Sequence, residues 1–390
     1  MQRTAQDWLV LTQLTHNSAA AVGTVMALQY GPHLLLLPLT GFAADHFDRR
    51  KLLICTQTAM GVLALGLGVL TVTGVVRLWH VYVFALLLGC ATAFDSPANQ
   101  TFVTELVGEE DLTNAVALNS TSFNTARMTG PALAGLLIAS LGTGWAFLVN
   151  AASFGAVVVA LRMLRVEELH RLRKATRAAT GGLADGFRYV WGRPDLQALL
   201  LMVLLIGTFG LNFPIYLSTM AVSVFHVGPS TFGVITGIMG VGTIAGALLA
   251  AGRERQHFSV LLAGAGWFGL GCALAAITPD YWLFAFAMML VGVAAVTFTN
   301  SSNSLVQLST EPAMRGRVMA IRLAIILGGT PLGAPIAGWV ADRFGPRWAL
   351  AVGAASGVAA VIVGVIYLAK FRNLRVSVGA GRIRFSIDGP

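Results

Sequence analysis

The stretch GPALAGLLIASLGTGWAFLVNAASFG, from Gly130 to Gly155, is matched later in the chain by GAPIAGWVADRFGPRWALAVGAASG, from Gly333 to Gly357. A constant shift of 203 residues superimposes the two stretches, including several glycines, one tryptophan and an Ala-Ala-Ser triplet. The same shift places NAVAL, which begins at Asn114, over RVMAI, which begins at Arg317. Agreement at so many positions indicates an internal duplication. The chain therefore consists of two homologous halves.

The composition excludes a water-soluble fold. Of the 390 residues, 56% are hydrophobic and only 11% are charged, and the mean hydropathy is +0.74. Soluble proteins average about 25% charged residues. One membrane-spanning helix needs about 20 apolar residues, so a dozen spans would take roughly 240 positions and leave the rest for loops. The three cysteines, Cys55, Cys90 and Cys272, lie inside apolar runs and lack the spacing of a disulfide framework or a zinc site.

Apolar runs divide the chain into predicted spans. They cover residues 18–40, 52–75, 80–104, 112–140, 144–164, 197–225, 229–251, 258–278, 281–307, 316–341 and 347–370. The preceding segment MQRTAQDWLVLTQL is too short to cross a bilayer alone, and with it we expect twelve spans. The sequence thus predicts an all-α membrane protein with two six-helix bundles. Their expected ranges are 1–164 and 197–370, joined by a linker over 165–196 and followed by a tail over 371–390.

The basic residues predict the orientation in the membrane. The linker is the longest polar stretch and is rich in arginine. Threading the chain with both ends and the linker in the cytoplasm places 20 of the 26 Lys and Arg residues on that side, against Arg77, Arg343 and Arg347 outside. An excess of cytoplasmic Lys and Arg is the usual determinant of orientation. Topology thus accounts for the net charge of +9, and a nucleic-acid partner loses its main support.

The stretch GFAADHFDRRKLL, from Gly41 to Leu53, resembles the signature between helices two and three of the major facilitator superfamily. We expect Asp45 to cap the turn and the following basic residues to anchor it. The resemblance implies that Asp45 meets the start of helix eleven, where the partial positive charge of a helix favours a carboxylate. The alternative is a plain basic loop with a capping acid. The predicted gating motif comprises Gly41, Asp45, Arg49, Arg50, Arg315 and Arg317.

The predicted fifth helix contains ARMTGPALAG, which resembles the glycine-proline signature of antiporters in this superfamily, with Gly130, Pro131 and Gly135. Small residues recur every fourth position at Ala126, Gly130 and Ala134, a spacing that lets another helix approach closely. Pro131 cannot donate a backbone hydrogen bond, so we expect a bend there. Any tightly packed membrane helix can show the same pattern, which is the alternative interpretation.

Four further stretches resemble bacterial exporters of the transmembrane secretion effector type, related to the enterobactin exporter. They begin at Trp8, Phe94, Gly186 and Gly207, and with the motifs above they extend the resemblance over nearly the whole chain. The chain departs from the family pattern at Asn99, where members carry Arg, and at Met1, which matches an internal methionine of helix one. We therefore expect a start site further upstream. A truncated first helix and an inactive transporter are the alternative.

Polar residues inside the predicted spans are the remaining functional candidates, because an ionised side chain at the bilayer centre costs about 3 kcal/mol even on the milder scales. Asp7, Asp95 and Arg127 are candidates for proton coupling. A structural ion pair is the alternative for these charges. Asparagines are weaker candidates for lining a polar cavity, with interhelical hydrogen bonding as the alternative. They are Asn119, Asn124, Asn212, Asn300 and Asn303.

The sequence therefore predicts a secondary transporter that exports a small organic molecule, drug-like or a siderophore, across the bacterial plasma membrane in exchange for protons. A metabolite importer or facilitator of the same fold is the alternative. No phosphate-binding loop is present, so ATP is not expected, and no other cofactor or metal is indicated. The seven histidines are scattered, which argues against a membrane enzyme. The sequence carries no signal for oligomeric state.

The predicted orientation can be tested by labelling single cysteines from each side of the membrane. Cysteines at Ala179 in the linker and at Thr143 between the predicted fifth and sixth helices should react with an impermeant maleimide from opposite sides. Labelling of both positions from the same side would contradict the twelve-span arrangement.

Overall fold

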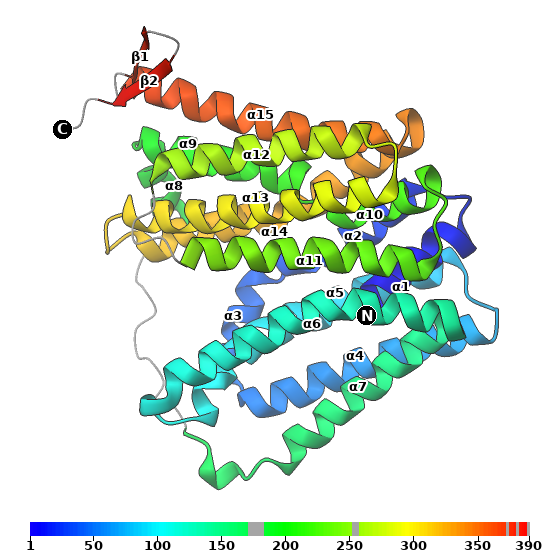
Figure 1. Ribbon diagram of the computed structural model, residues 1–390. Helices are drawn as coiled ribbons and strands as arrows, with labels where there is room; N and C mark the ends of the chain where they lie inside the picture. The colour runs from blue at the N-terminus through cyan, green and yellow to red at the C-terminus, as the bar shows by residue number, and fades with distance from the viewer. Residues whose placement is uncertain (171–182, 252–256, 372–373, 380–381, 388–390) are drawn as a thin grey trace.

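The computed structural model describes residues 1–170, 183–251, 257–371, 374–379 and 382–387. Some side chains within these ranges lie outside the description: Pro38, Gly41, Phe42, Ala44, Asp45, Glu109, Thr113, Ser120, Asn124, Arg127, Met128, Glu168, Leu183, Ala251 and all from Phe371 onward. The described chain runs back and forth as long helices in two lobes (Figure 1).

The first half supplies six crossing segments. They are α1 Gln2–Leu9, extended by the π-helical turn Val10–Leu14; α2 Ala19–Leu35 with α3 Leu37–His46; α4 Arg49–Val72; α5 Leu78–Leu106; α6 Leu112–Leu141; and α7 Thr143–Met163. Single 3-10 turns, Glu109–Asp111 and Val166–Glu168, precede α6 and follow α7.

The second half begins with a short helix, α8 Leu183–Trp191, and continues with six crossing segments. The first of these is α9 Pro194–Leu205 with α10 Phe213–Thr219, joined and extended by π-helical turns at Ile206–Gly210 and Met220–Val224. The others are α11 Pro229–Ala251, α12 Phe258–Ile277, α13 Tyr281–Leu308, α14 Arg315–Phe344 and α15 Pro346–Phe371. An antiparallel pair of strands, β1 Leu374–Gly379 and β2 Arg382–Ile387, adds a small hairpin to the otherwise helical fold.

The duplication seen in the sequence is also present in the helices. Helix α6 begins at Leu112 and α14 at Arg315, and α7 begins at Thr143 and α15 at Pro346, so each start is displaced by the same 203 residues. Both hairpins turn on a glycine with positive φ, 92° at Gly142 and 103° at Gly345. Other residues rarely adopt this conformation. The predicted division into two six-helix bundles is therefore confirmed, while the bounds of linker and tail stay a prediction.

The predicted spans agree with the helices within a few residues, with one larger difference. The second segment runs on through α3 to His46 instead of ending near residue 40. Asp45 therefore lies in the last turn of α3, and because its side chain lies outside the described residues, its capping of the turn stays a prediction. Asp48 caps the next helix, since its carboxylate accepts a hydrogen bond from the Lys51 backbone N–H at 3.0 Å. Asp48 fulfils this role because α4 starts at the next residue.

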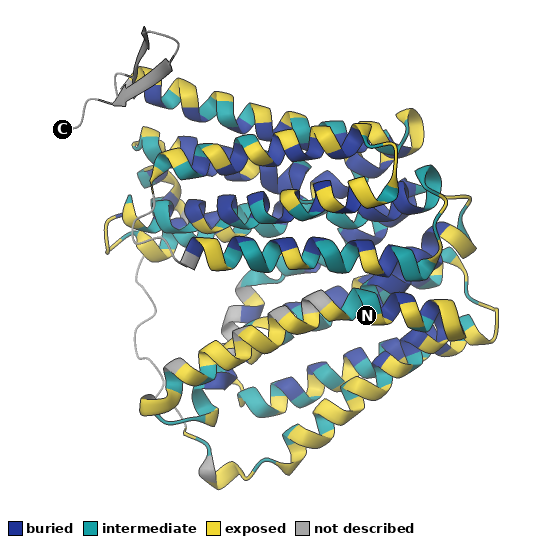
Figure 2. Ribbon diagram, in the orientation of Figure 1, coloured by how far each residue is buried: buried dark blue, intermediate teal, exposed yellow. Residues whose placement is uncertain are grey.

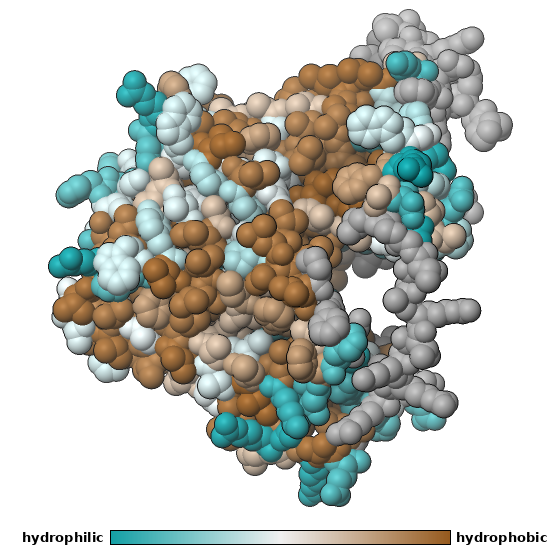
Figure 3. Space-filling view, turned by 180° about the vertical axis from the view of Figure 1, so that it is seen from behind, coloured by the Kyte–Doolittle hydropathy of each residue, from teal (hydrophilic) through white to brown (hydrophobic). Residues whose placement is uncertain are grey.

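Nine helices in the described residues are long and apolar enough to span a membrane. The other three crossing segments fall short for visible reasons: the first is short, the second is interrupted at Leu36, and only Thr129–Leu141 of α6 is strongly apolar. Large apolar side chains such as Val62, Leu248 and Trp267 are more than 60% exposed. Exposed and hydrophobic surface covers much of the middle of the bundle (Figures 2 and 3). Such a surface is stable only against lipid.

The two ends of the bundle differ, and we name them by their chain connections. The linker end holds the end of α7, helix α8 and the end of α15. The turn end holds the short turns after residues 14, 72, 141, 224, 277 and 344. Thr143 at the turn end is only 2% exposed, and its hydroxyl donates to Gln13 Oε1 at 3.2 Å. Val75, which is 56% exposed, is therefore the better labelling site at that end.

Each half is fastened within itself at the linker end. In the first half, Arg49 pairs with Glu105 at 2.6 Å, and Arg50 donates to the backbone carbonyls of Leu161 and Arg162. In the second half, Arg193 donates two hydrogen bonds to Asp195 and one, of 3.0 Å, to the Ser309 carbonyl oxygen. The hydrogen bonds with Asp195 raise the pKa of the Arg193 guanidinium. These contacts keep each bundle together without joining one to the other.

Candidate functional site: the contact between the two halves

The halves meet most extensively where α2 packs on α14 and where α6 packs on α11. The first contact is made by backbone against backbone. A Cβ atom at Gly23 would lie 2.5 Å from the carbonyl oxygen of Ala334, and one at Gly338 would lie 2.5 Å from that of Ala19. A side chain at either glycine would collide with the opposite helix. Small residues are the usual means by which membrane helices approach this closely.

The α6–α11 contact uses the glycine-proline motif that the sequence singled out. A Cβ atom at Gly135 would lie 2.5 Å from the Pro229 carbonyl oxygen, and one at Gly233 would lie 2.7 Å from the Pro131 carbonyl oxygen. Helix α6 continues through Pro131. Gly130 lies apart from this contact, because a Cβ there would be 3.6 Å from the Met1 nitrogen. The motif thus lets the two halves approach, through Pro131 and Gly135.

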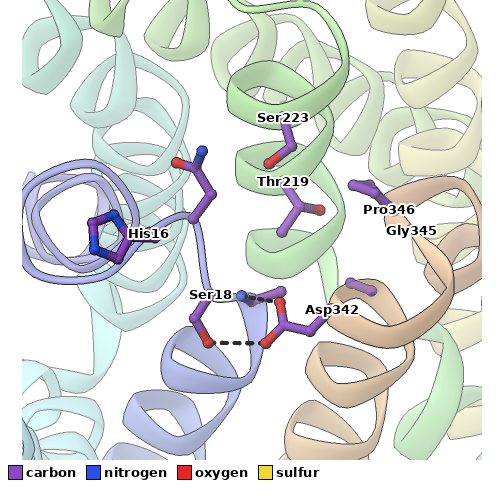
Figure 4. A pocket seen from close by; sticks show the side chains of 10 residues that line it. His16, Ser18, Thr219, Ser223, Asp342, Gly345 and Pro346 are labelled. Atoms are coloured by element: carbon purple, nitrogen blue, oxygen red, sulfur yellow. Dashed lines mark hydrogen bonds between the residues drawn. The ribbon is translucent and has the colours of Figure 1, made fainter.

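A carboxylate joins the halves at the rim of the turn end. Asp342, in the last turn of α14, accepts hydrogen bonds from the Ser18 hydroxyl at 2.8 Å and from the Ala19 backbone N–H at 2.6 Å (Figure 4). It also accepts one from the Ala20 backbone N–H at 3.0 Å. These groups form the beginning of α2, where a negative charge is stabilised by the helix dipole. Ser18 also caps α2 itself, accepting from the Ala21 N–H at 3.3 Å. Asp342 therefore caps a helix of the other half.

A polar pocket of about 410 Å³ opens beside this carboxylate. Its lining comes from both halves: His16, Asn17, Ser18, Ala19, Thr219, Ser223, Ala341, Asp342, Gly345 and Pro346. Sequence reasoning missed Asp342. A signal was present, because an acid in the last turn of a helix is disfavoured by that helix's own dipole and calls for a partner elsewhere.

Toward the linker end the halves part. Helix α6 diverges from α11 in that direction (Figure 1). Between Asn114 and Ala126, every residue of α6 whose burial is described is exposed except Ala115, which is intermediate. Further along the same helix, Ala134 and Ile138 are buried. The contact between the halves is therefore concentrated near the turn end.

The predicted gating motif is divided between the two lobes. The described contacts of Arg49 and Arg50 lie within the first half. In the second half, Arg315 Nε donates to the Gln307 carbonyl oxygen at 3.1 Å, and Arg317 Nη1 lies 3.0 Å from the Met314 sulfur. The side chain of Asp45 and the surroundings of Gly41 lie outside the description. The contact of Asp45 with helix eleven stays a prediction.

The three charges predicted for proton coupling have different surroundings. Asp7 is buried in α1, where the positive charge of Arg3 acts on its carboxylate. Its neighbour Trp8 stacks on Phe232 of the other half, with 5.7 Å between ring centroids. Asp95 is half-buried and accepts from Thr56 Oγ1 at 2.7 Å and Gln57 Nε2 at 3.0 Å, both on α4. The side chain of Arg127 lies outside the described residues.

The predicted cavity asparagines do not form one group. Asn119 and Asn300 are exposed and Asn303 is half-buried, while the side chain of Asn124 lies outside the described residues. Asn212 is fully buried where the seventh segment breaks, just before Phe213 and Pro214. Its Nδ2 donates to the Thr208 carbonyl oxygen at 2.8 Å. Asn212 therefore compensates an unwound stretch of backbone within its own segment, a role that neither the cavity lining nor the interhelical hydrogen bond of the sequence analysis describes.

A second charged residue was missed by sequence reasoning. Arg322 of α14 is only 6% exposed and donates to the Thr299 carbonyl oxygen at 2.9 Å and to Ser302 Oγ at 3.0 Å. In the part of the chain that the structure describes, no acidic side chain pairs with it. The described residues also contain no group of three or more His, Cys, Asp or Glu side chains that could hold a metal ion.

Two six-helix halves that meet around a pseudo-symmetric contact define a membrane transporter of the major facilitator type. The sequence matches the family described as transmembrane secretion effector over residues 1–377. The chain belongs to this family of the major facilitator superfamily. Its members are transporters and not enzymes.

Comparison with known proteins gives the same assignment. The multidrug efflux pump Tap of Mycolicibacterium fortuitum is 28% identical over 353 residues, covering 87% of this chain and 85% of the pump. The enterobactin exporter EntS of Shigella flexneri is 25% identical over 369 residues, covering 94% of this chain and 87% of the exporter.

Solved structures show the same fold. The nucleoside transporter NupG superimposes with a TM-score of 0.72 at 16% identity, covering 95% of this chain and 98% of that one. A bacterial homologue of the iron transporter ferroportin, in an inward-facing state, gives 0.67 at 16% identity, covering 94% and 95%.

The α6–α11 contact can be tested with a single methyl group. Gly135→Ala should push the halves apart at the turn end, since overpacking typically costs ~1–3 kcal/mol. Transport should fall, and a cysteine at Val75 should report greater movement at that end. Gly155→Ala is the matched control, because a Cβ at Gly155 of α7 meets nothing within 4 Å. Equal transport in the two variants would show that close packing at Gly135 is not required.

Proposed function

We propose that this protein exports a small organic molecule, drug-like or a siderophore, from the bacterial cytoplasm in exchange for protons. The observation that carries the proposal is the contact between the halves, packed near the turn end and parted toward the linker end. A transporter that alternates its access must close one end of the contact while the other is open. The names of the relatives, an efflux pump and a siderophore exporter, favour export.

The orientation follows from the basic residues. With the linker end in the cytoplasm, most Lys and Arg residues lie on the cytoplasmic side, as the positive-inside rule requires. The end of α15 is then cytoplasmic, whereas Met1 lies within the bundle, near Gly130 of α6 (Figure 1). The state described here is the one that receives substrate from the cytoplasm, which is the loading state of an exporter. In the opposite state Asp45 would meet the start of α14 and hold the linker end closed, as the family resemblance implies.

Proton coupling is assigned to Asp7 in preference to Asp95. A buried carboxylate in a membrane segment must be paired, protonated or both during the cycle. Asp7 adjoins Trp8, whose ring stacks on Phe232 of the other half, so movement of the halves changes its surroundings. The partners of Asp95 both lie on α4, within its own half. Arg127 lies in α6, in the same half of the chain as Asp7. It is the proposed partner whose positive charge favours the ionised form of Asp7.

Export can be measured in inside-out membrane vesicles that contain the protein. We expect ethidium or enterobactin to accumulate when the vesicle interior is acidified, and the accumulation to collapse with a protonophore. A metabolite importer would instead move substrate in the opposite direction under the same gradient. Accumulation that ignores the proton gradient would contradict antiport while leaving the fold assignment intact.

The two acids are separated by isosteric substitution. Asp7→Asn should abolish uphill export, a loss of at least about tenfold, because a neutral amide cannot carry a proton through the cycle. Exchange of labelled substrate at equal concentrations should persist, since it needs no net proton movement. Asp7→Glu should restore part of the uphill export. Loss of uphill export in Asp95→Asn but not in Asp7→Asn would instead assign proton coupling to Asp95 on α5. Full uphill export in both Asn variants would contradict coupling by these acids.

A further inference from the structure

Asp342 is placed unfavourably for its own helix and favourably for a helix of the other half. It lies two residues before the end of α14, where the partial negative charge of the helix dipole opposes a carboxylate. Its two oxygens instead accept three hydrogen bonds from the first residues of α2. The gain from this contact therefore exists only while α2 and α14 are together at the turn end.

The position suits a contact that forms and breaks. Asp342 and Ser18 lie at the rim of the interface, beside the open polar pocket, and Asp342 is exposed. An exposed charge at a helix end contributes little compared with a buried one, so releasing it is not prohibitive. When the halves separate at this end, water from the pocket can replace the lost hydrogen bonds.

We propose that Asp342 is the latch that holds the turn end closed while the linker end is open, and that its release from α2 accompanies opening of the turn end. The proposal rests on the alternating-access part of the proposed function, and is independent of substrate, coupling ion and direction. It places a positioning residue at the opposite end of the helix pair from the predicted Asp45 contact.

The chain provides a matched control for a merely structural cap. Asp280, also at the turn end, accepts from the backbone N–H groups of Trp282 and Leu283 at 2.8 and 3.4 Å. It thus caps α13 of its own half. Asp280→Asn removes the same charge from the same kind of site without touching the contact between the halves.

The test measures distances across the turn end by spin-label spectroscopy. Labels go on cysteines at Val75 of the first half and Gly228 of the second, in protein whose Cys55, Cys90 and Cys272 are replaced by serine or alanine. Val75 is exposed, and a side chain at Gly228 meets open space. The protein is reconstituted in nanodiscs without substrate, so that the reading does not depend on transport.

We expect Asp342→Asn to shift the population toward the longer distance by about two- to fivefold, the ratio that corresponds to loss of an exposed charge–dipole contact. Ser18→Ala, which removes one of the three hydrogen bonds together with the Ser18 cap of α2, should shift it in the same direction by less. Asp280→Asn should leave the distribution unchanged.

Two outcomes overturn the latch: an unchanged distribution in both Asp342→Asn and Ser18→Ala, or an equal shift in Asp280→Asn. If Asp342→Asn does not fold, Ser18→Ala decides alone. Failure of the proposed function gives a different result. If no export is measured but Asp342→Asn still shifts the distance, the latch stands and the proposed substrate or coupling ion is wrong.

Discussion

The close approach of backbones between the halves is the constraint on which the rest of the structure depends. Glycines at positions 23, 338, 135 and 233 leave no room for a side chain where α2 meets α14 and where α6 meets α11. In lipid there is no hydrophobic gain from joining two apolar helices, so such packing must come from surface fit. Because these glycines lie toward the turn end, the fit closes that end and lets the halves part at the other.

The two halves share the glycines of this close contact but differ in their charged residues. Gly135 and Gly338 occupy equivalent positions in the two halves, and both face a helix of the opposite half. At the position equivalent to Asp342 the first half has Ala139, and at that of Arg322 it has Asn119. The backbone contact is thus shared by both copies, whereas the charges of Asp342 and Arg322 belong to the second copy alone.

Much of the fold followed from the sequence because long apolar runs and a constant repeat shift are properties of the chain itself. The importance of Gly135 followed for the same reason, since small residues at helical spacing are visible in one sequence. Asp342 did not, because its partners are mainly backbone N–H groups at the start of α2, which carry no side-chain pattern. The cap at Asp48 was not predicted, because the apolar run ends near residue 40 and gives no sign that α3 continues to His46. Arg127 and Asn124 remain predictions.

The interruption of the second segment at Leu36 has a mechanical consequence. Leu36 lies between α2 and α3 with φ −93° and ψ 2°, and Pro38, which has no N–H, prevents the helix from running through. Helix α3 has ten residues and is therefore about 15 Å long. A rotation of about 10° at this joint swings the far end of α3 through roughly 2–3 Å, for a lever of that length. Helix α2 precedes the break at Leu36. Helix α3 can therefore move while α2 stays packed against α14.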